Sequence, residues 1–276
     1  MFKTGLQKEF MFFSRSFRMW GVIIAAFAFV FLDPVLMKML DAITSSVAEM
    51  DPAALGADPT LAGISFEGMN MSQMGIIGAM GDLTSTMMLI MMLVIMYTAG
   101  GELKKRSMII PQNAGLTPKL YLLPKFLLYP IFAGLLTFVG IICSWLFSFA
   151  LYSEVNAGAA EVLLASLLAA VLQMFMMTLY LTLGLCTAKA GLSVAVVYGG
   201  NVLLSALFTS LGADKFHPFT LTSQAQSIIL DGEIDHANFW GSIGITLLLV
   251  LLCYFVTLFV VSAKRIDNRG AEEINL

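Results

Sequence analysis

Apolar and polar positions divide the chain into six long apolar runs separated by shorter polar stretches. A helix that crosses a bilayer needs about 20 predominantly apolar residues, and each run approaches or exceeds that length. The runs predict membrane-spanning helices near residues 20–40, 76–99, 126–151, 162–187, 191–211 and 239–262. We therefore expect an all-α integral membrane protein in which residues 1–276 form a single transmembrane domain.

Residues 1–19 follow a different pattern, in which apolar side chains recur every three or four positions. This spacing places them on one face of a helix, and charged or polar side chains occupy the other faces. The apolar face comprises Phe2, Leu6, Phe10, Phe13, Phe17 and Trp20, and the polar faces include Lys3, Lys8, Arg15 and Arg18. The pattern predicts an amphipathic helix along the inner membrane surface, with a frayed, solvated terminus as the alternative.

The composition agrees with a chain that lies mostly in lipid. Apolar residues make up 59% of the sequence, charged residues 12%, and the mean hydropathy is +0.88. Soluble domains carry about 25% charged residues. The formal net charge of −3 provides no basic surface for nucleic acid, which we therefore exclude as a partner. The lipid bilayer is the expected surrounding.

Positively charged residues lie mainly on one side of the predicted spans. Thirteen of the fifteen Lys and Arg fall in the N-terminal segment, the 101–125 loop, the turn at Lys189 and the tail after Ala263. Only Lys38 and Lys215 lie on the other side. Cytoplasmic loops carry an excess of positive residues, so the pattern predicts a multi-pass protein of the plasma membrane with both termini in the cytoplasm.

The sequence offers little catalytic or metal-binding chemistry. Cys143, Cys186 and Cys253 all lie in apolar runs without the paired spacing of a metal or redox site. His217 and His236 are the only histidines, and no catalytic triad or zinc motif can be assembled from them. A phosphate-binding Gly-x-x-x-x-Gly-Lys-Ser/Thr loop is also absent. We expect no catalytic residue, metal or bound cofactor in this chain.

Asp33 and Asp82 are acidic residues within or beside apolar runs. A helix that begins at Trp20 reaches Asp33 after about 20 Å, inside a hydrocarbon core of about 30 Å. A carboxylate there is costly unless it meets water or a partner, which indicates a transport path or ion coupling. Alternatively, Pro34 ends or kinks the helix and places Asp33 at the membrane interface. The same two interpretations apply to Asp82, at the outer end of the second span.

Methionines are concentrated in the second run, where Met88 and Met92 belong to a group between residues 87 and 96. Flexible thioether side chains suit a path that accepts varied apolar molecules. They suit ordinary packing between helices equally well. Met88 and Met92 are therefore candidates for the lining of a transport path, with core packing as the alternative.

Small residues recur every four positions in the fifth run, at Gly191, Ala195 and Gly199. This spacing places them on one helix face, where they let another helix approach closely. The partner helix belongs either to another span or to a second copy of the chain.

The segment between the second and third runs, residues 100–125, combines charged, turn-forming and apolar positions. Its pattern predicts a helix that continues out of the second span, a break between Pro111 and Gly115, and a new helix. Thr117 is the expected N-cap of that helix and Pro118 its first residue. Such a short helix–turn–helix predicts a docking surface for a cytoplasmic partner, with an ordinary positively charged loop as the alternative.

The order of these features resembles the permeases of the type 2 export family of ATP-binding-cassette (ABC) transporters. The shared features occur in the same order along the chain. They are an acidic residue past the second span, basic residues with a following Ser, a Pro-to-Gly break, a helix that starts with Leu-Thr-Pro, and a Lys that opens the third span. The amphipathic start, the six spans and the segment from Pro218 to Gly232 extend the resemblance. In that family, the last segment forms short helices that dip back into the outer leaflet.

The resemblance implies a membrane-spanning permease subunit of an exporter, driven by a separate ATP-hydrolysing subunit. A short cytoplasmic coupling helix between spans 2 and 3 would contact that subunit. The implied docking residues are Glu102, Lys105, Arg106, Ser107, Pro111, Gly115, Thr117, Pro118 and Tyr121. ATP and Mg are expected in the partner subunit, and two permease copies are expected to pair as a homo- or heterodimer.

Two other functions remain open at the level of the sequence. An ion-coupled secondary carrier would use Asp33 and Asp82, and it would need no ATPase. A non-transporting scaffold or sensor subunit would hold a cytoplasmic partner through the same 101–125 loop. For the carrier, we expect Asp33→Asn to abolish transport. For the scaffold or sensor subunit, we expect the ATPase activity of the complex not to change when a candidate substrate is added.

Overall fold

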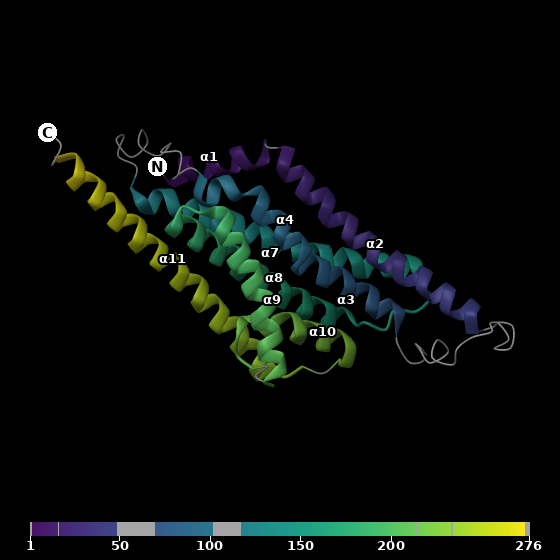
Figure 1. Cartoon of the computed structure of the whole chain (residues 1–276). Coiled ribbons are helices and arrows are strands. Elements are labelled where there is room, and N and C mark those ends of the chain that lie inside the picture. The colour runs from purple at the N-terminus through teal and green to yellow at the C-terminus, as the bar shows by residue number, and fades with distance from the viewer. Residues whose placement is uncertain are drawn as a thin grey trace, which may run out of the picture.

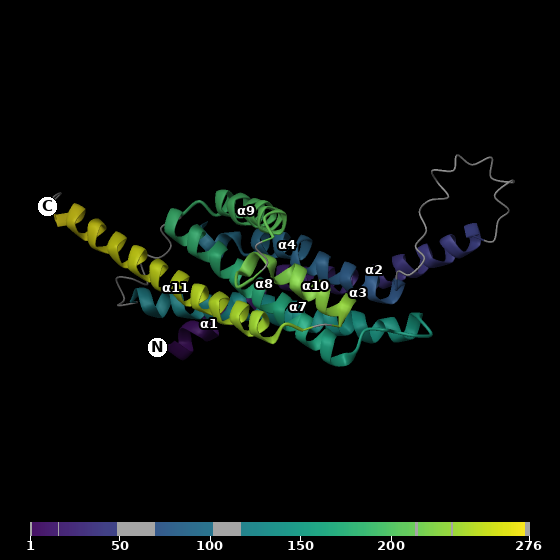
Figure 2. The same cartoon turned by 90° about the horizontal axis from the view of Figure 1, so that it is seen from below.

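The computed structural model of the chain describes residues 2–15, 17–48, 70–101, 117–212, 215–232 and 234–273. Within these ranges the chain is helical apart from short turns, and no strand occurs. Six described helical segments are long and apolar enough to cross a membrane: Met19–Ile43, Met71–Val94, Pro118–Leu151, Ala159–Thr187, Ala190–Ser210 and His236–Ala263. The predicted all-α membrane protein with six spans is confirmed (Figure 1 and Figure 2).

The helices follow one another with short connections. In chain order they are α1 (Phe2–Ser14), α2 (Phe17–Ala48), α3 (Met71–Thr84), α4 (Thr86–Val94), the π-helix η1 (Tyr97–Gly101), α7 (Pro118–Leu151), α8 (Ala159–Thr187), α9 (Ala190–Ser210), the 3-10 helix η2 (Pro218–Thr220), α10 (Leu221–Asp231) and α11 (His236–Glu273). The second span therefore consists of α3, α4 and η1, with a break in regular α-helix at Ser85.

Helix α8 forms the centre of the bundle, and α7, α9, α10, α11 and η1 all pack against it. Most of its side chains are buried along the whole length of the helix. Helices α2, α9 and α11 lie further out and leave large apolar side chains exposed, among them Ile24, Leu203 and Phe259. A continuous apolar exterior of this kind is stable only against lipid.

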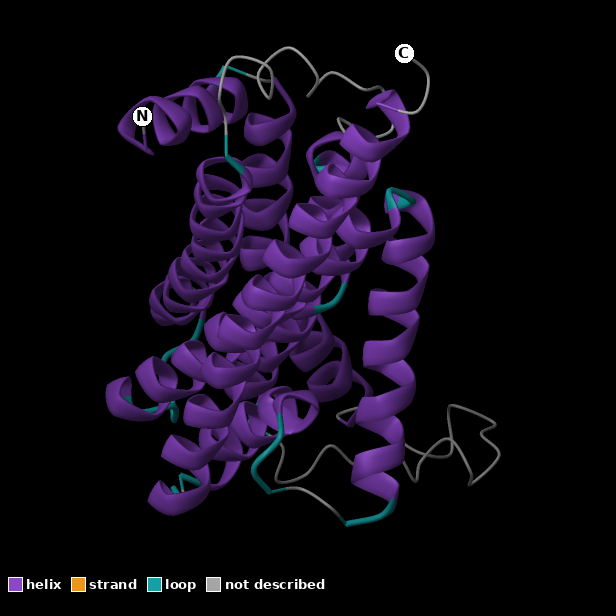
Figure 3. Ribbon diagram, turned by 90° about the vertical axis from the view of Figure 1, so that its left-hand side faces the viewer, coloured by secondary structure: helices purple, strands orange, loops and turns teal. Residues whose placement is uncertain are grey.

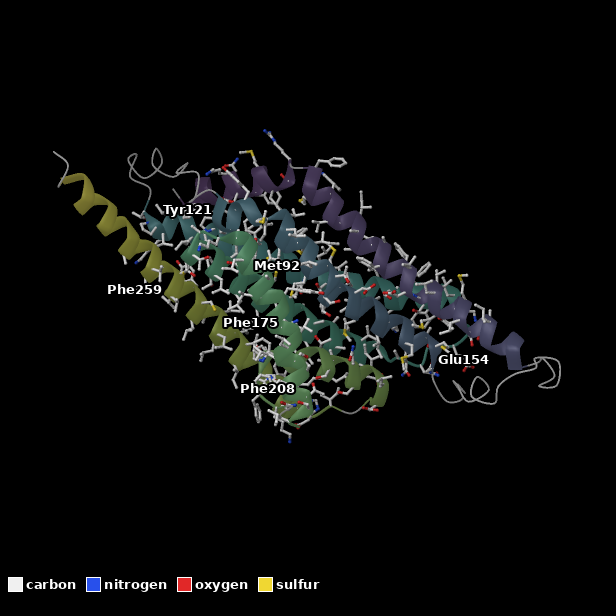
Figure 4. All side chains as sticks on the ribbon, in the orientation of Figure 1. Met92, Tyr121, Glu154, Phe175, Phe208 and Phe259 are labelled. Carbon is white, nitrogen blue, oxygen red and sulfur yellow. The ribbon has the colours of Figure 1, made fainter. Side chains whose placement is uncertain are left out.

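The bundle has two distinct ends. Figure 3 shows α1 and the C-terminal part of α11 at one end, which we call the α1 end. The helix α10 lies at the other, which we call the α10 end (Figure 1). Figure 4 shows Tyr121, in the first turn of α7, and Glu154, just beyond the last residue of α7, at opposite ends of the bundle. With 34 residues, α7 is about 51 Å long, so it exceeds a hydrocarbon core of about 30 Å.

Helix α7 differs from its prediction at the N-terminal end. We expected a separate short helix near Thr117–Tyr121, followed by a span from residue 126. The structure instead has one continuous helix from Pro118, so these residues form its first turn. Pro124 and Pro130 lie inside the helix without ending it. Neighbouring helices and local adjustment can satisfy the backbone groups that a proline frees within a membrane bundle.

The N-terminal helix also differs in its bounds. It ends at Ser14 rather than near residue 19, and α2 begins at Phe17. Phe10 and Phe17 are exposed, whereas Phe13 is buried against the bundle. Part of the apolar face predicted for residues 1–19 therefore packs on the bundle, and the rest is exposed. The position of α1 along the inner membrane surface stays a prediction.

Two further predictions concern the helix at Pro34 and the segment from Pro218 to Gly232. Pro34 does not end the first spanning helix, because α2 continues from Phe17 to Ala48 through it. Short helices do form after Pro218, namely η2 and α10, and they end at Gly232. Gly232 has a left-handed backbone with φ of 69°, which glycine adopts without strain. Helix α10 packs on α8 and α3.

Candidate functional site

The predicted docking residues lie mostly beyond the part of the chain that the structure describes. Glu102, Lys105, Arg106, Ser107, Pro111 and Gly115 all fall in 102–116, outside the described residues. Thr117 is the N-cap of α7, as predicted: its side-chain oxygen accepts a hydrogen bond from the Leu120 N–H at 3.4 Å, and Pro118 follows at the first helical position. Tyr121 is buried, with 6% of its surface exposed.

A buried ion pair joins α1 to α7 beside Tyr121. Oε1 of Glu9 lies 3.3 Å from Nζ of Lys125, and the two side chains are 6% and 0% exposed respectively. The Lys125 ammonium also lies 4.7 Å from the centre of the Tyr121 ring, within reach of a cation–π interaction. Burying two charges is unfavourable unless the pair is well placed and supported by further hydrogen bonds. The stability of this ion pair therefore depends on the groups that surround it.

Tyr129 supplies that support. Its hydroxyl donates a hydrogen bond to Oε2 of Glu9 at 3.1 Å and also lies 3.4 Å from Oγ1 of Thr98 in η1. The Phe13 ring packs edge-on against the Tyr129 ring, with 5.4 Å between ring centres. We call Glu9, Thr98, Tyr121, Lys125 and Tyr129 the Glu9–Lys125 cluster. It connects α1, the end of the second span and the start of the third.

The π-helix η1 is held against α8 by a close backbone contact. A Cβ atom at Gly184 would overlap the carbonyl oxygen of Ala99, and one at Gly100 would lie 2.9 Å from the carbonyl oxygen of Gly184. Only glycine permits this approach, which explains both residues. Single turns of π-helix are frequent at functional sites. Thr98 of the Glu9–Lys125 cluster lies in this same turn.

The Glu9–Lys125 cluster holds α1, η1 and α7 together through groups that contact one another. Its carboxylate is paired and its lysine is sequestered from solvent, so neither is available to a substrate in this arrangement. Glu9 and Tyr129 were not predicted from the sequence, and Lys125 was predicted only as the start of the third span. A signal for Glu9 was present: it follows Leu6 by three residues and precedes Phe13 by four, so a charged residue stands on the apolar face of α1.

Asp33 lies where α2 packs on α3. A Cβ atom at Gly75 would lie 2.9 Å from Cα of Pro34, and one at Gly78 would lie 3.4 Å from Cβ of Asp33. Oδ2 of Asp33 is buried and has no hydrogen-bond partner among the described residues. Asp82 follows Gly78 by one turn, near the middle of the Met71–Val94 span rather than at its outer end. The two carboxylates therefore belong to facing helices.

Tyr152, the C-cap of α7, ties the loop after α7 to α2 at the level of Asp33. Its hydroxyl donates a hydrogen bond to the Pro34 carbonyl at 3.0 Å, and Nζ of Lys38 lies 5.0 Å from the centre of its ring. Lys38 also pairs with Asp41 at 3.3 Å, where both side chains are nearly half exposed. Burial, and secondarily the negative charge of Asp41, raise the pKa of Tyr152 to about 12. The phenol therefore remains a neutral donor at ordinary pH.

The predicted path-lining methionines lie in the core. Met88 and Met92 are fully buried in α4, which packs on α2, α8 and α9. Met96, by contrast, is 41% exposed. Figure 4 shows Met92 in the middle of the bundle. Any path along these methionines would run inside one chain.

The other candidate residues show no arrangement for metal binding. No group of three or more His, Cys, Asp and Glu side chains that could hold a metal ion occurs within the described ranges. The His217 ring packs on Phe208, with 4.1 Å between ring centres. Cys143 and Cys186 are partly buried and Cys253 is buried, and no disulfide joins any of the three.

Comparison with known proteins adds no relative. No family model, no curated protein and no solved structure matches the chain.

Proposed function

We propose that this chain is the membrane-spanning permease subunit of an ABC-type exporter. A separate ATP-hydrolysing subunit binds the cytoplasmic loop between η1 and α7. ATP and Mg are bound in that partner subunit, and two permease copies pair as a homo- or heterodimer. The proposal rests on the six-span fold and on the order of features that this chain shares with type 2 export permeases.

The observation that carries the proposal is the position of the 102–116 loop in the chain. The loop joins η1 directly to α7, and both elements contribute side chains to the Glu9–Lys125 cluster. A subunit that moved this loop would therefore act at once on the second span, on the third span and on α1. Helix α8 contacts η1 and α7, so the movement would reach the centre of the bundle.

Gentle purification of the tagged chain from its native membranes tests the proposal. We expect an ATPase subunit to copurify at fixed stoichiometry, and the triple change of Glu102, Lys105 and Arg106 to Ala to release it. Lys189→Ala is the matched control, because Lys189 is an exposed basic residue in the turn between α8 and α9, outside the proposed docking segment. A folded chain that purifies alone would contradict the proposal. An ATPase that binds but does not respond to any transported substrate would favour a scaffold or sensor subunit.

An ion-coupled carrier is the second candidate, and it rests on Asp33. A buried carboxylate oxygen without a hydrogen-bond partner, on a helix that faces Asp82, is a typical ion or proton site within a membrane. This function requires that Asp33→Asn abolish uptake or efflux in proteoliposomes that contain the chain alone. Transport by proteoliposomes without any ATPase would support the carrier, and unchanged transport in Asp33→Asn would exclude it.

A further inference from the structure

The central helix α8 carries a row of buried polar side chains that take no part in the Glu9–Lys125 cluster. Ser166, Gln173 and Tyr180 follow one another at intervals of seven residues. Seven residues are almost two helical turns, so the three side chains lie on the same face of α8. Each is 0% exposed. We call them the α8 polar row.

Two members of the α8 polar row are buried without hydrogen-bond partners. Ser166 donates a hydrogen bond to the Leu163 carbonyl at 2.9 Å. In contrast, both side-chain polar atoms of Gln173, Nε2 and Oε1, lack a hydrogen-bond partner among the described residues. The same is true of the Tyr180 hydroxyl. Buried polar groups in folded proteins are almost always bonded to protein or to ordered water, because leaving them unpaired is costly. These three atoms therefore require a partner other than the described residues, and ordered water is the simplest one.

The surroundings of the row define the chemistry of that partner. Gly184 follows Tyr180 by one turn and contacts η1, so this face of α8 is directed toward the second span, where Met88 and Met92 are buried. The only charged residue of α8 is Glu161, at its first turn. A charged molecule would find no counter-charge along the row. The amide of Gln173 and the phenol of Tyr180 can each donate and accept hydrogen bonds. The matching ligand is therefore a neutral group that can also donate and accept hydrogen bonds.

We propose that Gln173 and Tyr180 line a polar path inside the single chain and bind a small neutral hydrogen-bonding group there. Water occupies the row at rest, and a hydroxyl or amide of an amphipathic transported molecule replaces it during transport. Met88 and Met92 of α4, a helix that packs on α8, accommodate the apolar part of that molecule. The cargo part of this inference rests on the proposed transport function, whereas the hydration of the row does not.

Cysteine labelling tests whether water reaches the row. In a chain whose three native cysteines are replaced by Ala, Gln173→Cys and Tyr180→Cys are exposed to 2-aminoethyl methanethiosulfonate in native membranes. The reactive species is the thiolate, which forms a mixed disulfide and releases methanesulfinate, so the reaction needs water at the thiol. Leu168→Cys is the control, because Leu168 is 0% exposed and lies on the opposite face of α8.

We expect both row positions to react at least about tenfold faster than Leu168→Cys, because a hydrated thiol ionises more readily than one in an apolar core. Equal, slow labelling at all three positions would overturn the proposal. Tyr180→Phe provides a second measurement if the cysteine variants fold poorly. Removing a hydroxyl that is bonded to water lowers the thermal unfolding temperature, whereas removing one without a partner in a dry core raises it, and a rise would also overturn the proposal.

A protection experiment separates water from cargo. N-methyldecanamide carries the predicted amide on an apolar chain, and decyl methyl ether lacks the donor. We expect the amide alone to slow the labelling of Tyr180→Cys, in which Gln173 is intact. Labelling that neither compound slows would leave water as the sole occupant and overturn the cargo part. Because labelling needs no ATPase, it remains informative if no ATPase copurifies and the exporter proposal fails.

Discussion

At the scale of single residues, Glu9 and Lys125 illustrate how a buried ion pair can be costly to break and yet add little stability. In Glu9→Met, the Lys125 ammonium would remain buried without its counter-charge. We expect this variant to lose about 3–5 kcal/mol in the free energy of unfolding. The double variant Glu9→Met with Lys125→Met removes both charges, and we expect its stability to equal or exceed that of the parent chain. Denaturant unfolding in detergent measures both values.

A matched control separates the ion pair from a general effect of removing a lysine. Lys119 lies on α7 like Lys125 but is exposed, so Lys119→Met should change stability by less than about 0.5 kcal/mol. If the double variant were as unstable as Glu9→Met, the loss would come from packing rather than from the uncompensated charge. The interpretation of the Glu9–Lys125 cluster would then be wrong.

Tyr152 gives a prediction in alkaline solution. Its pKa in the folded protein is raised to about 12 from an ordinary value of 10.0. The unfolded chain therefore releases this proton at lower pH than the folded one. The resulting contribution to stability is complete below pH 10 and is lost as the pH rises from about 10 to 12. Comparing the pH dependence of unfolding for the parent chain and Tyr152→Phe isolates this contribution, and identical curves would contradict it.

At the scale of elements, the contact between η1 and α8 depends on Gly184. A methyl group there would overlap the Ala99 carbonyl oxygen, and a backbone atom cannot turn away as a flexible side chain can. We expect Gly184→Ala to destabilise the protein by about 1–3 kcal/mol. Gly200→Ala is the control, because a Cβ atom at Gly200 meets nothing within 4 Å and Ala favours the helix. Thermal unfolding of the two variants should therefore shift in opposite directions.

The elements themselves were largely predictable from the sequence. A spanning helix is specified by the length of an apolar run, and that signal is local. All six predicted runs correspond to helices that can span a membrane. The boundaries were less accurate, because prolines such as Pro34 and Pro124 do not end helices that neighbouring helices support. The first turn of α7 was therefore separated from its span in the prediction.

The candidate site could not be predicted, since it depends on contacts between distant parts of the chain. Tyr129 is 120 residues from Glu9 and 31 from Thr98, and no periodic pattern reports such a meeting. The unpaired amide of Gln173 is equally invisible in the sequence, where it is one polar residue in an apolar run. Only the position of Glu9 on the apolar face of α1 provided a local signal, and its partner could not be inferred from it.

At the scale of the whole molecule, α9 offers a surface for a second copy of the chain. Gly191 and Ala195 are exposed and Gly199 is partly exposed, so the predicted ladder of small residues is not covered by the described part of the chain. A Cβ atom at Gly199 meets nothing within 4 Å. We expect a second permease copy to pack there, because small residues allow close approach between helices in lipid.

Substitution on α9 tests this pairing. Gly199→Leu fills the ladder. In native mass spectrometry from detergent, we expect the parent chain to be a dimer and this variant to be a monomer. Gly21→Leu is the control, because Gly21 is exposed on α2, where a Cβ atom also meets nothing within 4 Å. Two variants with the same mass distribution as the parent chain would exclude the ladder as the interface.

The link between α1 and α7 has a consequence for the way the protein is made. The N-terminal helix is synthesised first, but its partners Lys125 and Tyr129 leave the ribosome only after the first two spans have been completed. Until then, Glu9 lacks the buried partners that it has in the folded chain. The ion pair can form only once the first turns of α7 have been made. Packing of α1 on the bundle is therefore a late step in the assembly of the first three spans.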